Sequence, residues 1–135
     1  MREATLATWN DVVSYLNANY NCKEESKTML SLLFDTGNDR SHLVFVELAG
    51  NDKIGEFAKV SAVVGNSKDF NKLEALCRAA TPYVTGGIVI EGDAILLRDS
   101  LPLLNLDINE LEDPLRVITN AADRIEAEIT GGDDY

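Results

Sequence analysis

The clearest hydrophobic pattern in the chain runs through residues 107–130. Its apolar positions lie alternately three and four residues apart, which places them in one stripe along a helix: Ile108, Leu111, Leu115, Ile118, Ala122, Ile125 and Ile129. Asp107 is suited to cap the first turn, with Glu110 completing a capping box. Gly131-Gly132 ends the helix. The pattern predicts a long helix, about six turns, that packs on an apolar surface.

Pro114 interrupts this pattern, because proline lacks a backbone N–H and its ring clashes with the preceding turn. Two outcomes are open at this position. Either the helix kinks, or Asp113 caps a second helical segment with Pro114 at its first position. We expect the apolar stripe to cover the chain's own sheet, with a contact between part of the stripe and a partner as the alternative.

The chain opens with a second amphipathic pattern. Its apolar positions again alternate in steps of three and four: Leu6, Trp9, Val13, Leu16 and Tyr20. This spacing predicts a helix over residues 5–19. Asparagines at positions 17, 19 and 21 favour a turn after the helix. We interpret residues 22–27 as a polar link.

Three strands are predicted after this link, over residues 28–35, 42–48 and 56–64. The first is almost continuously apolar, which is typical of a strand buried on both faces. Turn-forming residues at 36–39 and 50–52 separate the three strands. Because these connections are short, we expect adjacent strands to pair as an antiparallel meander.

A further helix and two strands are predicted before the last helix. Asp69 is placed to cap a helix over residues 70–80, which ends at Thr81-Pro82. Strands follow over residues 88–91 and 94–99, with glycine-containing turns before and between them.

The order of elements is therefore α-β-β-β-α-β-β-α. Helices and antiparallel hairpins in one short chain predict an α+β fold, with helices packed on one face of a twisted antiparallel sheet. A length of 135 residues suits one domain over residues 1–135. We expect residues 131–135 to form a frayed tail.

The charge balance restricts the possible partners. Twelve basic residues against 23 acidic ones give a formal net charge of −11. Such a charge disfavours nucleic acids and anionic membranes, since binding to either requires Lys and Arg to neutralise phosphates. No apolar run reaches ~18 residues, and the opening residues lack the apolar core of a signal peptide. We therefore expect a cytoplasmic protein that binds neither nucleic acid nor membrane.

Residue types that often carry chemistry are few. Two cysteines far apart in sequence and a single histidine provide no zinc-binding pattern. Cys77 is interpreted as a core residue of the 70–80 helix, Cys22 as an incidental loop residue and His42 as structural. The carboxylates of the last helix are interpreted as a solvated surface. We predict no catalytic, cofactor-binding or metal-binding residues and no cofactor.

The triplet Asp35-Thr36-Gly37 follows two apolar residues, and this stretch resembles the catalytic signature of retroviral-type aspartic proteases. Those enzymes are dimers in which one Asp per subunit joins a carboxylate pair that activates a water. Leu97, in the later segment 95–99, stands where those proteases carry Gly. Three predicted helices also do not fit an almost all-β enzyme. We therefore interpret residues 35–39 as a hairpin turn, with a protease that uses Asp35 as the alternative.

Several segments together resemble one known superfamily. They are the opening helical stretch, the apolar strand that ends in an acidic turn with the strand after it, the late strand with the residues that follow it, and the closing helix: residues 9–20, 32–37, 43–46, 94–98, 100–104 and 111–129. These patterns cover nearly the whole chain. They are similar to the type III secretion chaperone-like superfamily, which includes small acidic effector chaperones and the YbjN family.

The resemblance implies a protein without catalytic activity. Effector chaperones of this superfamily are typically acidic homodimers that hold an extended client segment along sheet and helix surfaces, whereas the YbjN branch is described as regulatory. For this chain the resemblance implies a homodimer with a protein client or a regulatory partner, and both branches remain open. We expect the last strand and the last helix to hold the client. A regulator that binds a small ligand between helix and sheet is a further alternative.

Overall fold

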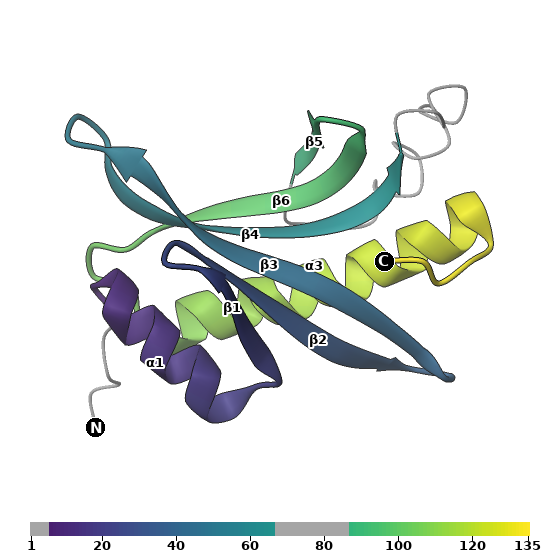
Figure 1. Cartoon of the computed structure of the whole chain (residues 1–135), viewed down its shortest axis with the longest axis horizontal. Helices are drawn as coiled ribbons and strands as arrows, with labels where there is room; N and C mark the ends of the chain where they lie inside the picture. The colour runs from purple at the N-terminus through teal and green to yellow at the C-terminus, as the bar shows by residue number, and fades with distance from the viewer. Residues whose placement is uncertain (1–5, 67–86) are drawn as a thin grey trace.

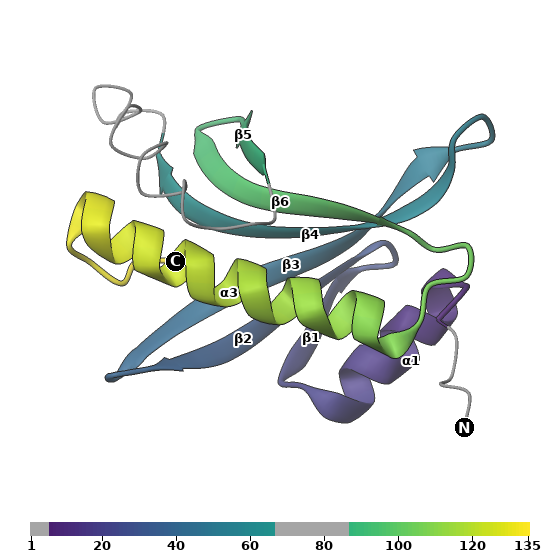
Figure 2. The ribbon, with the colours of Figure 1, turned by 180° about the vertical axis from the view of Figure 1, so that it is seen from behind.

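A twisted antiparallel sheet carries helices α1 and α3 on one face (Figure 1). The computed structural model describes residues 6–66 and 87–135. Within them the helices are α1 (Trp9–Asn19) and α3 (Ile108–Thr130). The strands are β1 (Cys22–Ser26), β2 (Met29–Gly37), β3 (Arg40–Asn51), β4 (Gly55–Asn66), β5 (Gly87–Glu91) and β6 (Ala94–Pro102). Figure 2 shows α3 lying along the sheet, with α1 beside β1 and the first half of α3.

The strands of the described residues form one sheet in the order β1-β2-β3-β4-β6-β5. β1 to β4 are successive antiparallel neighbours, and the sequence correctly predicted this meander for β2 to β4. The chain then returns as the β5–β6 hairpin, in which β6 pairs with β4 and β5 lies outside it. The predicted α+β class with an antiparallel sheet is therefore confirmed. The helix predicted over residues 70–80, with Cys77, lies outside the described residues.

Residues 22–27 are not a polar link, as the sequence suggested. Cys22–Ser26 form strand β1, which pairs with β2 so that Cys22 lies opposite Leu32. The prediction was wrong because β1 is an edge strand whose side chains are mostly exposed, so it lacks the apolar alternation of a half-buried strand. Charged residues on an exposed edge also hinder pairing with other chains.

Strand β2 is buried on one face, not on both as predicted. Leu32 is fully buried, whereas the side chain of Leu33 is 47% exposed. Because side chains alternate across a strand, neighbouring leucines point to opposite faces. The continuous apolar run in β2 therefore does not reflect burial of both faces of the strand. The side chain of Leu33 lies on the sheet face opposite α3.

The hairpin between β3 and β4 turns slightly later than predicted. β3 continues through Asn51, and the turn lies at residues 52–54 rather than 50–52. The Asn51 side chain accepts hydrogen bonds from the backbone N–H groups of Lys53 and Ile54. Gly50 belongs to the strand and has a φ of +108°, and a Cβ there would lie 2.0 Å from the Gly55 carbonyl oxygen. Gly50 is thus required by close backbone approach rather than by the turn.

Helix α1 begins at Trp9, later than the predicted residue 5. Thr8 is the N-cap, and its side chain and that of Asp11 exchange hydrogen bonds with each other's backbone N–H groups in a capping box. The fully buried positions of the helix include Val12, whereas the predicted Val13 is only partly buried. The Trp9 indole N–H donates to the carbonyl oxygen of Lys27, which ties the helix to the β1–β2 turn.

Helix α3 runs without a break through Pro114 (Figure 2). The alternative in which Asp113 caps a second segment is therefore wrong. Asp107 caps the helix with Glu110 in the predicted capping box. Leu111 and Leu115, on either side of Pro114, are both buried against the sheet, and this packing outweighs the hydrogen bond that proline cannot donate. The apolar stripe covers the chain's own sheet, as predicted.

Candidate functional site

The sheet face opposite α3 is not covered by any described helix (Figure 1). On β3 and β4 the fully buried side chains alternate with partly buried ones that point to this second face. We call it the open face. Cross-strand register places one row of its side chains side by side, since Phe45 lies opposite Ser61 and Ser61 lies opposite Arg98.

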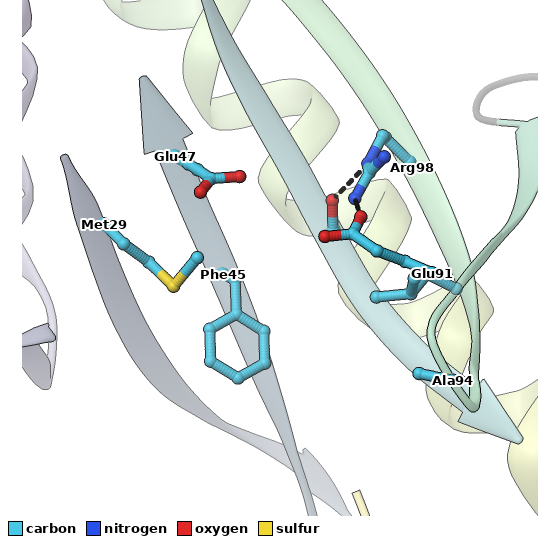
Figure 3. Close-up of a pocket in the computed structure, with 8 residues that line it drawn as sticks. Met29, Phe45, Glu47, Glu91, Ala94 and Arg98 are labelled. Atoms are coloured by element: carbon cyan, nitrogen blue, oxygen red, sulfur yellow. Dashed lines mark hydrogen bonds and ion pairs between the residues drawn. The ribbon is translucent and has the colours of Figure 1, made fainter. Parts of the chain in front are cut away.

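A shallow groove of about 220 Å³ lies on the open face. Figure 3 shows the side chains around it, which come from strands β2, β3 and β4 and from the β5–β6 hairpin: Met29, Phe45, Glu47, Ser61, Glu91, Ala94, Leu96 and Arg98. Pockets that enclose cofactors or drug-sized ligands usually measure about 300–1,000 Å³. This groove therefore has room for one large side chain rather than for a cofactor.

The groove combines an apolar floor with a charged wall. Phe45, Leu96 and Met29 supply the apolar surface. On the wall, the Arg98 guanidinium donates from Nε to Ser61 Oγ at 2.8 Å and pairs with the Glu91 carboxylate (Figure 3). This hydrogen-bonded ion pair lowers the pKa of Glu91 below its ordinary value. The carboxylate consequently stays ionised at the rim.

A second ion pair lies beside the groove. Glu47 and Lys59 are cross-strand partners, and their charged atoms are 3.1 Å apart. The two carboxylates, Glu47 and Glu91, therefore approach the groove from different strands.

The sequence contained one signal for this surface. The odd-numbered positions of β3, Leu43 and Phe45, are apolar although the even-numbered ones form the core.

A client was expected on the last strand and the last helix, but the edges of that strand and the apolar stripe of that helix are both occupied; side chains of β6 still line the groove. The last strand, β6, pairs with β4 on one side and β5 on the other, so it has no free edge. The last helix, α3, buries its apolar stripe from Leu111 to Ile125 under the sheet. A partly apolar groove lies instead in the middle of the open face.

A cluster of charged side chains lies beneath the other face of the sheet. His42, Asp123 and Glu126 are buried, and Arg40 reaches them from the first residue of β3. The interpretation of the α3 carboxylates as a solvated surface is wrong for Asp123 and Glu126. The curved sheet buries α3 over a wider stripe than the apolar residues alone indicate, and this wider stripe includes both carboxylates.

The hydrogen-bond partners of the two ring nitrogens define the orientation of the His42 side chain. Nε2 lies 2.9 Å from the carbonyl oxygen of Val63, which can only accept, so Nε2 carries a hydrogen. Nδ1 lies 3.3 Å from Asp123 Oδ1 and 3.7 Å from Glu126 Oε1. Both ring nitrogens of His42 therefore face oxygen atoms, one on β4 and the others on α3. His42 is fully buried between β4 and α3, and its partners could not be read from the sequence.

These three residues have the types and spacing of metal ligands. Arg40, however, already fills the place that a cation would take. Its Nη2 lies 3.2 Å from Asp123 Oδ1 and 3.3 Å from Glu126 Oε1. A divalent ion bound to the same oxygens would be repelled by the guanidinium charge. The arrangement fits a charge cluster organised around Arg40 better than a metal site.

The Asp-Thr-Gly triplet lies in a tight hairpin. Asp35 is exposed near the end of β2, and its carboxylate accepts a hydrogen bond from the backbone N–H of Gly37 at 2.9 Å. Gly37, Asn38 and Asp39 all have positive φ values, between +54° and +89°. This conformation is the reason for the Gly and Asn. A hairpin turn is confirmed here, but it is shorter than predicted, because residues 35–37 belong to β2 and only residues 38–39 form the turn.

No known protein-family model matches this chain, and no curated protein is significantly similar to it. The groove on the open face and the charge cluster are therefore interpreted from their own geometry. Neither α1 nor α3, the helices of the described residues, has an apolar stretch that is long enough to cross a bilayer.

Proposed function

We propose that this protein is a non-enzymatic, chaperone-like binding module that holds an extended segment of a client polypeptide on the open face. The observation that carries the proposal is the groove floored by Phe45, Leu96 and Met29, on a sheet face without a covering helix among the described residues. Apolar surface left accessible on a sheet is a common docking site for protein segments.

The chemistry of the groove specifies the client segment. The apolar floor accommodates one large apolar side chain, and the volume of the groove is too small for a second one. Glu91 at the rim remains 58% exposed even though it pairs with Arg98. Together with the net charge of −11, this rim favours a segment in which Lys or Arg flanks the apolar residue.

The resemblance to the type III secretion chaperone-like superfamily supports the same role. It adds two parts to the proposal, a homodimer and a cytoplasmic location. Light scattering during size-exclusion chromatography measures the mass of the particle directly. A particle of twice 14.8 kDa is the result that we expect, and a monomer at micromolar concentration contradicts the homodimer.

An array of immobilised 15-residue peptides of systematically varied composition tests the binding function. We expect retained peptides to combine a large apolar residue with neighbouring basic residues. Phe45→Asp, which places a charge on the groove floor, should abolish retention. Leu104→Asp is the matched control, because Leu104 is 79% exposed in the loop between β6 and α3 and does not line the groove.

Two outcomes contradict the proposal. One is an array on which no peptide is retained by the folded wild-type protein. The other is retention that Phe45→Asp and Leu104→Asp change to the same extent, since binding would then not involve the groove.

A further inference from the structure

The segment after α3 turns back onto the body of the protein. Gly131 caps the helix in the left-handed conformation, with a φ of +73°, and reverses the chain. The segment 131–135, which the sequence predicted to fray, is instead held by specific contacts. The Asp133 carboxylate accepts from the Ser41 backbone N–H at 3.2 Å and lies 3.6 Å from Arg40 Nη2.

The place where this segment sits is a cleft between two strands. Pairing of β3 with β4 ends at Val44 and Ala62, although β3 begins earlier, at Arg40, and β4 continues to Asn66. The strands separate beyond that point, and the chain end marked C in Figure 1 lies between them. The cleft is lined by apolar side chains and by the end of the segment itself: Leu43, Phe45, Val63, Asp134 and Tyr135.

The Glu126 carboxylate accepts hydrogen bonds from the backbone of the segment in this cleft. Its side chain is fully buried, and Oε2 accepts from the backbone N–H groups of Asp134 at 2.6 Å and Tyr135 at 3.1 Å. The other oxygen, Oε1, faces Arg40 and His42. A buried carboxylate oxygen whose donors are two successive backbone N–H groups is an acceptor for a peptide whose backbone turns at that point, and it would lose these donors if the segment left.

We propose that this cleft is a peptide-binding site that the chain's own segment 131–135 fills, and that it accepts in exchange an acidic peptide of the pattern Asp-x-Tyr. Each part of the pattern has a partner. Arg40 and the Ser41 N–H bind the Asp carboxylate, and Glu126 binds two backbone N–H groups. Leu43, Phe45 and Val63 line the cavity beside the Tyr position. The proposal is independent of the client-binding groove, although Phe45 borders both.

The test uses the full chain with a weakened segment, Asp133→Asn together with Tyr135→Ala. The probe is a fluorescein-labelled peptide, acetyl-Gly-Gly-Asp-Asp-Tyr-amide, followed by fluorescence anisotropy. We expect the double variant to bind the probe at least about tenfold more tightly than the wild-type chain, in which the segment competes. Replacing the first Asp of the probe by Asn should weaken binding to the variant by about tenfold, the effect of one charge-assisted hydrogen bond.

A second variant is needed as a control, because the substituted segment could remain bound in the cleft and block the probe. A chain that ends at Gly131, shown to be folded by circular dichroism, should bind the probe with similar affinity to the double variant. The proposal is overturned if neither folded variant binds the probe. It is also overturned if the wild-type chain binds as tightly as the variants, or if binding is indifferent to the Asp of the probe.

Discussion

The Arg40 guanidinium holds the carboxylate of Asp123 in a two-pronged hydrogen bond, although the two residues lie 83 positions apart in the sequence. Nε lies 3.0 Å from Oδ2 and Nη2 lies 3.2 Å from Oδ1. This geometry joins the start of β3 to the second half of α3. Burial alone would raise the pKa of Asp123, but hydrogen bonds, the strongest from Arg40, lower it below the ordinary value. The pair therefore stays ionised within the fold.

Replacing Arg40 by Gln is expected to destabilise the protein markedly. The variant leaves two buried carboxylates, Asp123 and Glu126, without their guanidinium partner, and unpaired buried charge is far more costly than a lost surface pair. Urea unfolding followed by circular dichroism measures the change. The control is Arg116→Gln on α3, which removes an exposed pair with Asp113 and should change stability by no more than about 0.5 kcal/mol. Equal midpoints for the two variants would show that the cluster adds no stability.

Adjacent leucines on β2 test which face of the sheet is covered. Leu32→Ala should cost about 2–5 kcal/mol of unfolding free energy, because its side chain is fully buried under the helices. Leu33→Ala should cost less than about 1 kcal/mol, because Leu33 is 47% exposed on the open face. Chemical denaturation of both variants gives the two values. A cost for Leu33→Ala as large as that for Leu32→Ala would mean that the open face is covered.

Substitution of two glycines in the β3–β4 hairpin distinguishes two reasons for a loss of stability, an unfavourable φ angle and a steric clash with the neighbouring strand. Gly55 has a φ of +82°, and no heavy atom lies within 4 Å of the position that a Cβ would take, so Gly55→Ala should cost about 1–2 kcal/mol. Gly50→Ala should cost more, since its Cβ would overlap the Gly55 carbonyl oxygen. Thermal unfolding compares the variants. Equal melting temperatures would contradict the close approach of the two strands.

Glu126 is expected to make stability depend on pH in a defined direction. Burial raises the pKa of its carboxyl group above the ordinary value, and hydrogen bonds from the segment 131–135 oppose this only partly. The folded state therefore holds this proton more tightly than the unfolded state. Its contribution to stability is complete below about pH 4.3, the ordinary pKa of Glu, and is lost as the pH rises through the folded-state pKa.

Glu126→Gln isolates this contribution because the variant has no proton to lose at that position. The stability of the wild-type protein relative to the variant should decrease as the pH rises from about 4.3 through the folded-state pKa of Glu126. Asp123 acts in the opposite direction, since its lowered pKa gives stability that is lost in acid, but Asp123 is present in both proteins. Urea unfolding at a series of pH values supplies the difference. A constant difference would mean that Glu126 has no raised pKa.

Part of this architecture follows from local sequence patterns. The regular spacing from Leu111 to Ile125 correctly predicted a buried face of α3, and Asp107 with Glu110 correctly predicted its start. Strand β1 could not be predicted, because an exposed edge strand has no hydrophobic periodicity. The hairpins and the antiparallel sheet were predictable from short turns between strands.

The candidate sites depend on relationships that the linear sequence does not contain. Phe45 and Leu96 meet on one surface only because β6 returns beside β4, so that the groove joins β2 and β3 to the β5–β6 hairpin. Glu126 has the appearance of a surface residue in the helical pattern, and it is buried because the sheet curves around α3. A frayed end was the natural prediction for residues 131–135, since nothing in their composition identifies the strand gap that receives them.

The central claim is that the open face binds an extended client segment. Its most direct test is a map of backbone amide chemical-shift changes when the ¹⁵N-labelled protein is titrated with the best-retained peptide of the array. Changes concentrated at Phe45, Ser61 and Leu96, and absent in Phe45→Asp, are the predicted result. Changes confined to the exposed side of α3, or the same changes in Phe45→Asp, would contradict the account.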